Sequence, residues 1–467
     1  MSKYQGPKKF TLIIGGLILI GIGMVFGAYV VRTGWANKPQ ASQYEKIGIF
    51  LKVLNHVENN YVEEVNLKSL TYGAINGMLA TLDPHTNFLP PDVFKEIKVD
   101  TSGQFGGLGI EITVKEGILT VISPIEGTPA DKAGLKAGDK IVKIEDDFTD
   151  KMTLIEAVSK MRGKKGTPVT IQILREGLKE PKTYTIVRAI IKIQPLKSAL
   201  LDQDYGLARV INFQEGTARD LKKALDQLDD EAKKKQSKLK QSEVGLKGLI
   251  LDLRNNPGGL LEQAVEVADL FLEDGIIVST MGRNKENKDI EYAHKLGTWR
   301  NIPLIVLVNG SSASASEIVA GALQDHKRGI VVGTKTFGKG SVQQVIDLGD
   351  DSGLKLTVAK YYTPKGRSIQ EVGLEPDIAI EQIDPETLKE DEKKRGDKGG
   401  SWWREANLPR HLVKEDKEEK SQNKFSALIY MDEKFKYDYQ LHQAYGYLKS
   451  YTIFKGIEAE QPLTAKK

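Results

Sequence analysis

The chain has 467 residues, more than a single hydrophobic core usually organises, so we expect about three folded units joined by connectors. Its hydrophobic fraction of 40% and charged fraction of 28% exclude a largely disordered or polytopic protein. The net charge of +4 comes without a dense basic stripe, so no nucleic-acid partner is implied. Because the chain has no cysteine, disulfides, thiolate metal sites and a cysteine nucleophile are excluded.

The N-terminal residues have the pattern of a membrane span. Residues 1–10 carry three lysines, and residues 11–31 form an uninterrupted apolar run. The 21 residues of this run, at about 1.5 Å each, reach roughly 31 Å, which matches the hydrocarbon core of a bilayer. The positive-inside rule then places residues 1–10 in the cytoplasm and the rest of the chain on the other side of the membrane.

A cleaved signal peptide is the alternative, because residues 34–36 end in the small-x-small pattern that a signal peptidase accepts. The apolar run is longer than the usual hydrophobic region of a signal peptide, which favours the anchor. We therefore predict a single-pass protein of a bacterial inner membrane, with its body in the periplasm or outside the cell.

Residues 40–98 are predicted to form a small helical segment. Apolar residues recur at helical spacing over 47–57 and again over 67–78, and Asp83-Pro84 ends the pattern.

Residues 99–190 change to short β-type runs separated by glycine-rich turns, with helices predicted at 130–133 and 154–161. The β-type runs lie at 109–114, 119–122, 140–144, 169–174 and 183–187. A glycine-rich loop precedes the first run, and its backbone N–H groups are free to hold a carboxylate while a peptide extends the sheet edge. This segment resembles a PDZ domain of the kind found in bacterial proteases. The resemblance implies peptide-binding residues at Gly107, Leu108, Gly109 and Ile110.

Residues 195–380 alternate strand and helix, which predicts an α/β core. A strand at 248–253 precedes a helix at 261–272, and a strand at 303–308 precedes a helix at 314–324. The mixed-charge stretch 226–240 is interpreted as a solvated helix face or loop. Residues 381–467 form a charge-rich extension that ends in a helix at about 437–448. The predicted fold class is therefore multidomain α+β, with an N-terminal transmembrane helix, a helical segment, a β-rich PDZ module and an α/β core.

Common catalytic motifs are missing from the sequence. Neither GxSxG nor HExxH occurs, which argues against an α/β-hydrolase and a zincin. Residues 333–339 match GxxxxGK of a phosphate-binding loop, but Gly340 stands where a serine or threonine would bind magnesium. His326 lies beside Asp325, and adjacent residues on a helix point apart, so they cannot form a Ser-His-Asp arrangement.

Two loops have the chemistry of an acyl-transfer site. Residues 309–317 are rich in serine and connect a buried strand to a helix, whose N-terminal N–H groups suit an oxyanion. Serines at this position are also common helix caps. The second loop, residues 254–259, follows the preceding strand and offers another donor. A base is still needed, and Lys339 lies in a glycine-flanked turn before a strand that is expected to place Gln343 on the same face.

These residues are similar to the motifs of the carboxyl-terminal processing peptidases, and the resemblance covers about 47–380. It implies that the serine three residues before the glutamate, Ser314, is the nucleophile and that Lys339 is the general base. The assisting glutamine falls at Gln343, and an aspartate sometimes counted with the active site falls at Asp325, for which a structural role is the alternative. The implied oxyanion donors are the backbone of Ala315 and of Gly258 or Gly259.

The sequence thus predicts a membrane-anchored serine endopeptidase that recognises protein C-termini through its PDZ domain and needs no cofactor or metal. A homo-oligomer or an activating adaptor protein stays open. Two alternatives remain: an inactive membrane-tethered PDZ adaptor, and a His-dependent serine peptidase that would use His326.

Overall fold

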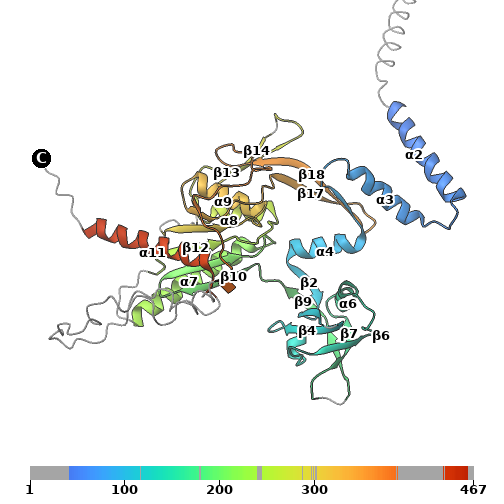
Figure 1. Ribbon diagram of the computed structural model, residues 1–467, viewed down its shortest axis with the longest axis horizontal. Coiled ribbons are helices and arrows are strands. Elements are labelled where there is room, and N and C mark those ends of the chain that lie inside the picture. The colour runs from blue at the N-terminus through green and yellow to red at the C-terminus, as the bar shows by residue number, and fades with distance from the viewer. Residues whose placement is uncertain are drawn as a thin grey trace, which may run out of the picture. The chain divides into compact units, whose positions relative to one another are not determined.

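The computed structural model describes residues 41–460, except for 116, 178–179, 239–244, 287, 296, 298, 300–301, 385, 388–434 and 436 (Figure 1). Several predicted segments lie outside the described residues: the cytoplasmic N-terminus 1–10, the span 11–31, the small-x-small pattern at 34–36 and most of the charged extension. Within the described ranges, no helix combines the length and the apolar character that a membrane crossing needs. The chain divides into two compact units, Met1–Leu82 and Asp83–Lys467.

The first unit contains two helices, α2 (Ala41–Asn60) and α3 (Leu67–Leu79). The side chain of Asn66 caps α3 by accepting a hydrogen bond from the Ser69 N–H at 3.1 Å. Both helices agree with the predicted apolar patterns. The predicted helical segment extended to residue 98, but residues from Asp83 onward belong to the second unit, where β1 (Asn87–Leu89) pairs with β18 (Gly353–Tyr362).

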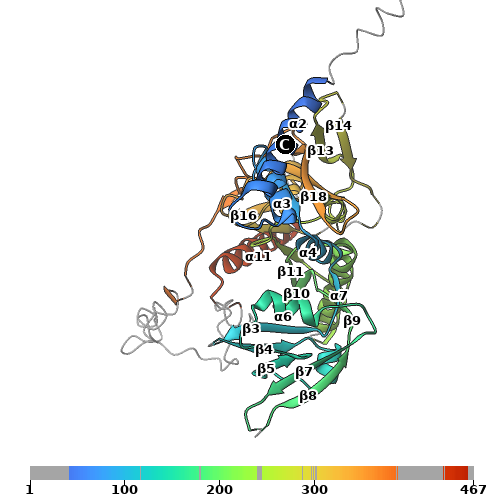
Figure 2. The same ribbon diagram turned by 90° about the vertical axis from the view of Figure 1, so that its right-hand side faces the viewer.

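The second unit begins with β1, the helix α4 (Pro91–Ser102) and a β-rich module (Figure 2). The module's main sheet has the order β3-β4-β5-β7-β8, with β6 beside β5. Its elements are β3 (Ile110–Lys115), β4 (Ile118–Pro124), α5 (Pro129–Lys132), β5 (Lys140–Ile144), β6 (Asp147–Phe148), α6 (Leu154–Met161), β7 (Pro168–Leu174) and β8 (Lys182–Val187). A two-stranded ladder of β2 (Gln104–Gly107) and β9 (Ala189–Lys192) pairs the segments that enter and leave the module. Every predicted strand and helix of this module is present.

The core is a six-stranded sheet of order β10-β11-β12-β15-β16-β19, parallel from β11 to β19. Its strands are β10 (Leu196–Leu201), β11 (Tyr205–Val210), β12 (Gly248–Asp252), β15 (Leu304–Val308), β16 (Ile330–Gly333) and β19 (Ile378–Ala379). Helices α7 (Thr217–Lys238), α8 (Leu261–Asp269) and α9 (Ala315–Asp325) cover one face, and α11 (Tyr439–Glu460) covers the other. Both faces of the sheet are covered because apolar side chains alternate along β12. Leu249 and Leu251 pack against the helices α7, α8 and α9, whereas Ile250 packs against α11.

A second, antiparallel sheet lies beside the core, with the order β1-β18-β13-β14 and with β17 paired to β18. Its remaining strands are β13 (Ile276–Gly282), β14 (Lys288–Tyr292), β17 (Ser341–Asp347) and β18 (Gly353–Tyr362). The pairing of β17 with β18 shifts register between Val342 and Gln343. This irregularity changes which side chains share a face of β17.

The stretch 226–240, interpreted as a solvated helix face or loop, is largely part of α7. Its charges lie on the solvent side, whereas Leu221, Leu225, Leu228 and Ala232 fall at helical spacing and are buried. The terminal helix predicted at about 437–448 extends to Glu460 as α11.

Candidate active site

The carboxyl ends of four adjacent parallel strands bring the candidate residues together. The loops after β11, β12, β15 and β16 all leave the sheet at the same edge, where open α/β sheets usually bind ligands. They border a cavity of about 560 Å³. Residues of these loops that line the cavity include Phe213, Gly258, Gly259, Ser314, Ala315 and Lys339. The fold therefore joins the predicted nucleophile, base and oxyanion loops in one cavity.

Ser314 lies between β15 and α9 with φ 55° and ψ −113°, a backbone conformation that L-residues rarely adopt. Such strain persists only where the surroundings fix the backbone. Gly258 packs directly against this turn, and a Cβ atom added there would lie 2.8 Å from the Ser314 Cβ. Only glycine allows the two loops to approach so closely.

Lys339 lies in the loop between β16 and β17 and is half-buried. Burial lowers the pKa of its ammonium group, and repulsion from Lys355 lowers it further, while Asp83 acts in the opposite direction. Both Lys339 and Lys355 line the cavity that contains Ser314. A lysine with a lowered pKa is better suited to accept a proton than a solvated one.

Glu317 fixes the backbones of both loops. Its Oε2 accepts the N–H of Ser314 at 2.8 Å and the N–H of Lys339 at 2.9 Å. Its Oε1 accepts the Thr336 hydroxyl at 2.6 Å and the Gly338 N–H at 2.8 Å. The side chain is fully buried, and burial raises its pKa although all four hydrogen bonds favour the ionised form. The carboxylate thus sets the Ser314 and Lys339 loops relative to each other.

Tyr361 of β18 connects the same two residues through their carbonyl groups. Its hydroxyl contacts the carbonyl oxygen of Ser314 at 3.1 Å and lies against that of Lys339. Sequence reasoning assigned no role to Tyr361 or Glu317. The spacing Ser314-x-x-Glu317 is that of a capping box, so a detectable pattern existed for Glu317. No sequence pattern indicates Tyr361, because the position of its side chain depends on how β18 packs.

Two backbone N–H groups can serve an oxyanion. Ala315 opens α9, and Gly259 lies in the loop after β12; among the described residues neither N–H has a hydrogen-bond acceptor. The N–H of Gly258 instead donates to Asn256 Oδ1 at 2.9 Å. The geometry therefore favours Gly259 over Gly258 as the second donor.

Gln343 borders the cavity, but not in the way that strand alternation predicted. Lys339 precedes β17, which begins at Ser341, and the register shift lies directly before Gln343. The Gln343 Nε2 donates to Ser341 Oγ at 2.9 Å and to Thr357 Oγ1 at 3.2 Å. Thr357 Oγ1 donates in turn to Asp83 at 3.2 Å. Gln343 is thus held by hydroxyl groups and lines the same cavity as Lys339.

Asp325 is the last residue of α9, ten positions from Ala315 and therefore about 15 Å along the helix from its first turn. It is buried, pairs with Arg367 and accepts the Lys365 N–H at 3.0 Å. This position makes it a structural residue of the 363–368 turn rather than a cavity residue. His326 caps the C-terminal end of α9, does not line the Ser314 cavity and contacts the Ile276 carbonyl oxygen at 2.7 Å, which disfavours the His-dependent alternative.

The predicted peptide-binding residues line a second cavity of about 230 Å³ in the β-rich module. Gly107, Leu108, Gly109 and Ile110 form one wall, and Val158 and Met161 of α6 lie on the other. In the part of the chain that the structure describes, no acceptor is present for the N–H groups of Leu108 and Gly109. These two donors lie at the end of a groove between β3 and α6, as peptide capture by strand addition requires.

Comparisons with known proteins agree with this organisation. The profile of Peptidase family S41 matches residues 204–380, and that of the PDZ domain matches 106–187. Residues 29–92 match the profile "Activating protease CtpB N-terminal domain".

The chain is 44% identical to the carboxy-terminal-processing protease of Bartonella bacilliformis over 443 residues, 95% of this chain and 96% of the relative. It is 35% identical to the carboxyl-terminal-processing protease of Synechocystis sp. over 399 residues, 80% of this chain and 86% of the relative. Among solved structures, the photosystem II D1 C-terminal processing protease is 32% identical, with a TM-score of 0.40, over 71% of this chain and 92% of that one. The predicted resemblance is confirmed: this chain belongs to the carboxyl-terminal processing proteases of peptidase family S41, which makes it a serine-type peptidase with a PDZ domain.

Proposed function

We propose that Ser314 and Lys339 form the catalytic pair of this protease and that Gln343 supports the lysine. The observation that carries the proposal is that both residues line one cavity while a single carboxylate, Glu317, binds the backbone N–H of each. The lowered pKa of Lys339 increases the neutral fraction that can act as a base. The amide of Gln343, held by two hydroxyl groups, lines the same cavity as Lys339.

The reaction follows from this arrangement. Neutral Lys339 takes the proton of the Ser314 hydroxyl as its oxygen attacks the peptide carbonyl carbon. The oxyanion accepts hydrogen bonds from the N–H groups of Ala315 and Gly259. Lys339 then gives its proton to the leaving amine as the C–N bond breaks. Water attacks the acyl-enzyme with Lys339 as the base, and the proton returns to Ser314.

We also propose that the PDZ groove selects protein C-termini. A terminal carboxylate would accept the N–H groups of Leu108 and Gly109, and the preceding residues would pair along the edge of β3. Binding there raises the local concentration of the substrate at the catalytic cavity. The substrate class is therefore a protein or peptide with a free C-terminus and an unstructured tail.

The test uses an unstructured protein with an apolar C-terminus, in its free-acid and C-terminally amidated forms. We expect the free acid to be cleaved with a KM about tenfold lower, because the amide removes the charge that the two N–H groups bind. The kcat should stay within about twofold, since catalysis occurs in a separate cavity. Gly109→Ala, which adds a side chain at φ 78° close to Thr128, should remove the difference between the two forms. Equal KM values for both forms in the parent enzyme would contradict C-terminal capture.

The apolar run 11–31 supports a further proposal, that the chain is anchored in the bacterial inner membrane with its catalytic body in the periplasm or outside the cell. Full-length protein expressed in a bacterium should stay in the membrane pellet after alkaline carbonate washing, whereas a chain starting at Gln40 should be released. Protease added to spheroplasts should digest the body of the full-length protein. Release of a processed form into the supernatant would instead support a cleaved signal peptide.

A further inference from the structure

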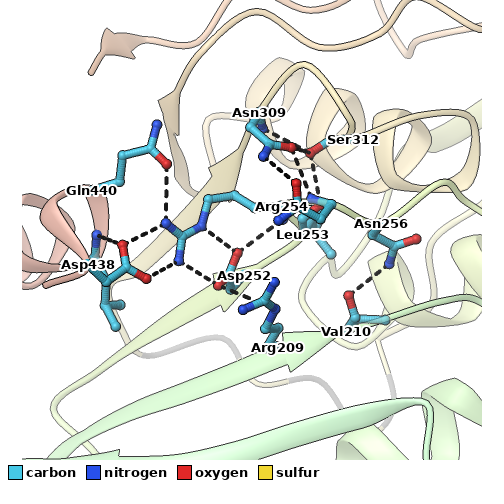
Figure 3. A network of polar contacts seen from close by, with 12 residues as sticks. Arg209, Val210, Asp252, Leu253, Arg254, Asn256, Asn309, Ser312, Asp438 and Gln440 are labelled. Carbon is cyan, nitrogen blue, oxygen red and sulfur yellow. Dashed lines mark hydrogen bonds and ion pairs between the residues drawn. The ribbon is translucent and has the colours of Figure 1, made fainter. Parts of the chain in front are cut away.

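The guanidinium of Arg254 is buried beside the catalytic loops and bound on two sides (Figure 3). On one side, Asp252 at the end of β12 accepts its Nε at 2.9 Å and its Nη2 at 2.8 Å. On the other, Asp438 accepts Nη1 at 2.8 Å and Nη2 at 2.7 Å, and Gln440 accepts Nη1 at 3.2 Å. Burial alone would lower the pKa of Arg254, but the bonds to both carboxylates outweigh it and raise that pKa.

The two acceptors Asp438 and Gln440 come from the C-terminal segment, 184 and 186 residues further along the chain. Every protein acceptor of the Arg254 Nη1 in the described structure belongs to this segment. Asp438 also caps α11, because its Oδ1 accepts the Leu441 N–H at 3.1 Å. The helix then packs on the sheet through a set of buried residues: Leu441, Ala444, Tyr445 and Leu448. The segment is therefore docked by apolar packing and bound to Arg254 by charge.

Arg254 is the first residue of the loop that carries Gly258 and Gly259. This loop is braced against the serine loop: Asn255 and Asn309 exchange hydrogen bonds at 3.0 and 2.8 Å. The carbonyl oxygen of Asn256 accepts the Ala313 N–H and the Ser316 hydroxyl, both at 3.0 Å. Figure 3 shows Asp438, Arg254 and Asn309 in one continuous polar network. A displacement of Arg254 would thus shift the oxyanion loop relative to Ser314.

We propose that Asp438 is a positioning residue for catalysis: through Arg254 it holds the 254–259 loop where the Gly259 N–H meets the oxyanion. This inference rests on the proposed Ser314 site and its oxyanion donors. It assigns a role to the C-terminal segment, which does not line the catalytic cavity and acts on it through Arg254, without touching substrate. The bond pattern explains why a carboxylate is required, because only two acceptor oxygens in one plane can bind Nη1 and Nη2 together.

The test compares Asp438→Ser and Asp438→Asn in the full chain. Serine and asparagine both cap a helix well, so α11 keeps its N-cap, but serine is too short to reach Arg254 and asparagine offers one acceptor oxygen. We expect kcat to fall about 10- to 100-fold for Asp438→Ser and less for Asp438→Asn, with KM within about twofold. A peptide boronic acid, whose serine adduct carries a tetrahedral oxyanion, should lose affinity by the same factor as kcat.

Leu448→Ala is the matched control, because it removes a buried contact of the same helix and leaves the Arg254 network intact. It should lower the melting temperature at least as much as Asp438→Ser while leaving kcat within about twofold. In an Arg254→Gln background, Asp438→Ser should add no further loss of kcat.

The inference is overturned if Asp438→Ser keeps the kcat and boronate affinity of the parent, or if Leu448→Ala lowers kcat in proportion to its loss of stability. Ser314→Ala, assayed in parallel, distinguishes failure of the positioning role of Asp438 from failure of the proposed Ser314 site. If that variant is inactive while Asp438→Ser matches the parent, only the positioning role fails. If Ser314→Ala still cleaves, the proposed site fails and the positioning role with it.

Discussion

Replacing Ser314 by alanine is expected to lower kcat by about 10⁴-fold or more, and Lys339→Met by about 10³- to 10⁴-fold, without loss of the fold. Alanine removes the oxygen that attacks in the proposed mechanism, and methionine keeps the length of the lysine stem but cannot accept a proton. Lys335→Met is the control within the same loop, because Lys335 is exposed and pairs with Glu375 at 2.7 Å. Its activity should stay within about twofold. Initial rates of peptide cleavage and melting temperatures of each variant check the result.

The pH dependence of the parent provides the second check on the same pair. In the proposed mechanism only neutral Lys339 accepts the serine proton, so kcat/KM should fall tenfold per pH unit on the acid side of the lysine pKa and level off above it. Burial, followed by repulsion from Lys355, lowers this pKa from the ordinary 10.5, so the plateau should begin at a lower pH than an exposed lysine would give. If Lys339→Met cleaves as fast as the parent, lysine is not the base. A parent that is inactive at every pH would support the PDZ adaptor instead.

Most of the catalytic loops were predictable because they depend on local pattern. The glycine loop before β3, the serine-rich turn after β15 and the Gly338-Lys339-Gly340 turn each carry residues whose conformation or chemistry is unusual wherever they occur. Gly109 with φ 78° and Gly338 with φ 91° have a backbone conformation that favours glycine, which is a local property of each turn. Such positions are visible in a sequence without knowledge of the fold.

Features set by long-range packing were not predictable in the same way. Strand alternation predicted a shared face for Lys339 and Gln343, but the register shift between Val342 and Gln343 arises from pairing with β18. The sequence placed Asp325 in the catalytic set through resemblance, whereas its partner Arg367 lies 42 residues away and holds it in a turn. The role of the C-terminal segment likewise depends on one distant pair, Arg254 with Asp438.

Replacing Glu317 by glutamine is expected to damage both halves of the site at once. The substitution keeps the size of the side chain but turns one acceptor oxygen into an NH₂ donor, which must face either the pair Thr336 and Gly338 or the pair Ser314 and Lys339. Two buried donors then lose their acceptor, at a cost of about 3 kcal/mol in the free energy of unfolding. We expect kcat to fall by about 10²-fold or more, because the nucleophile and base loops lose their common attachment.

Glu262→Gln is the matched control, because Glu262 is also in the first turn of a core helix, α8, but is exposed. It should change kcat less than twofold and leave the melting temperature nearly unchanged. A fluorescent peptide with a free C-terminus should bind the PDZ groove of Glu317→Gln with the affinity of the parent, because the described residues that line that groove include neither Glu317 nor any of its hydrogen-bond partners. If Glu317→Gln keeps the parental kcat, the carboxylate does not position the pair. If Glu317→Gln also loses peptide binding, its loss of activity reflects unfolding of the second unit. The result would then give no evidence that Glu317 positions Ser314 and Lys339.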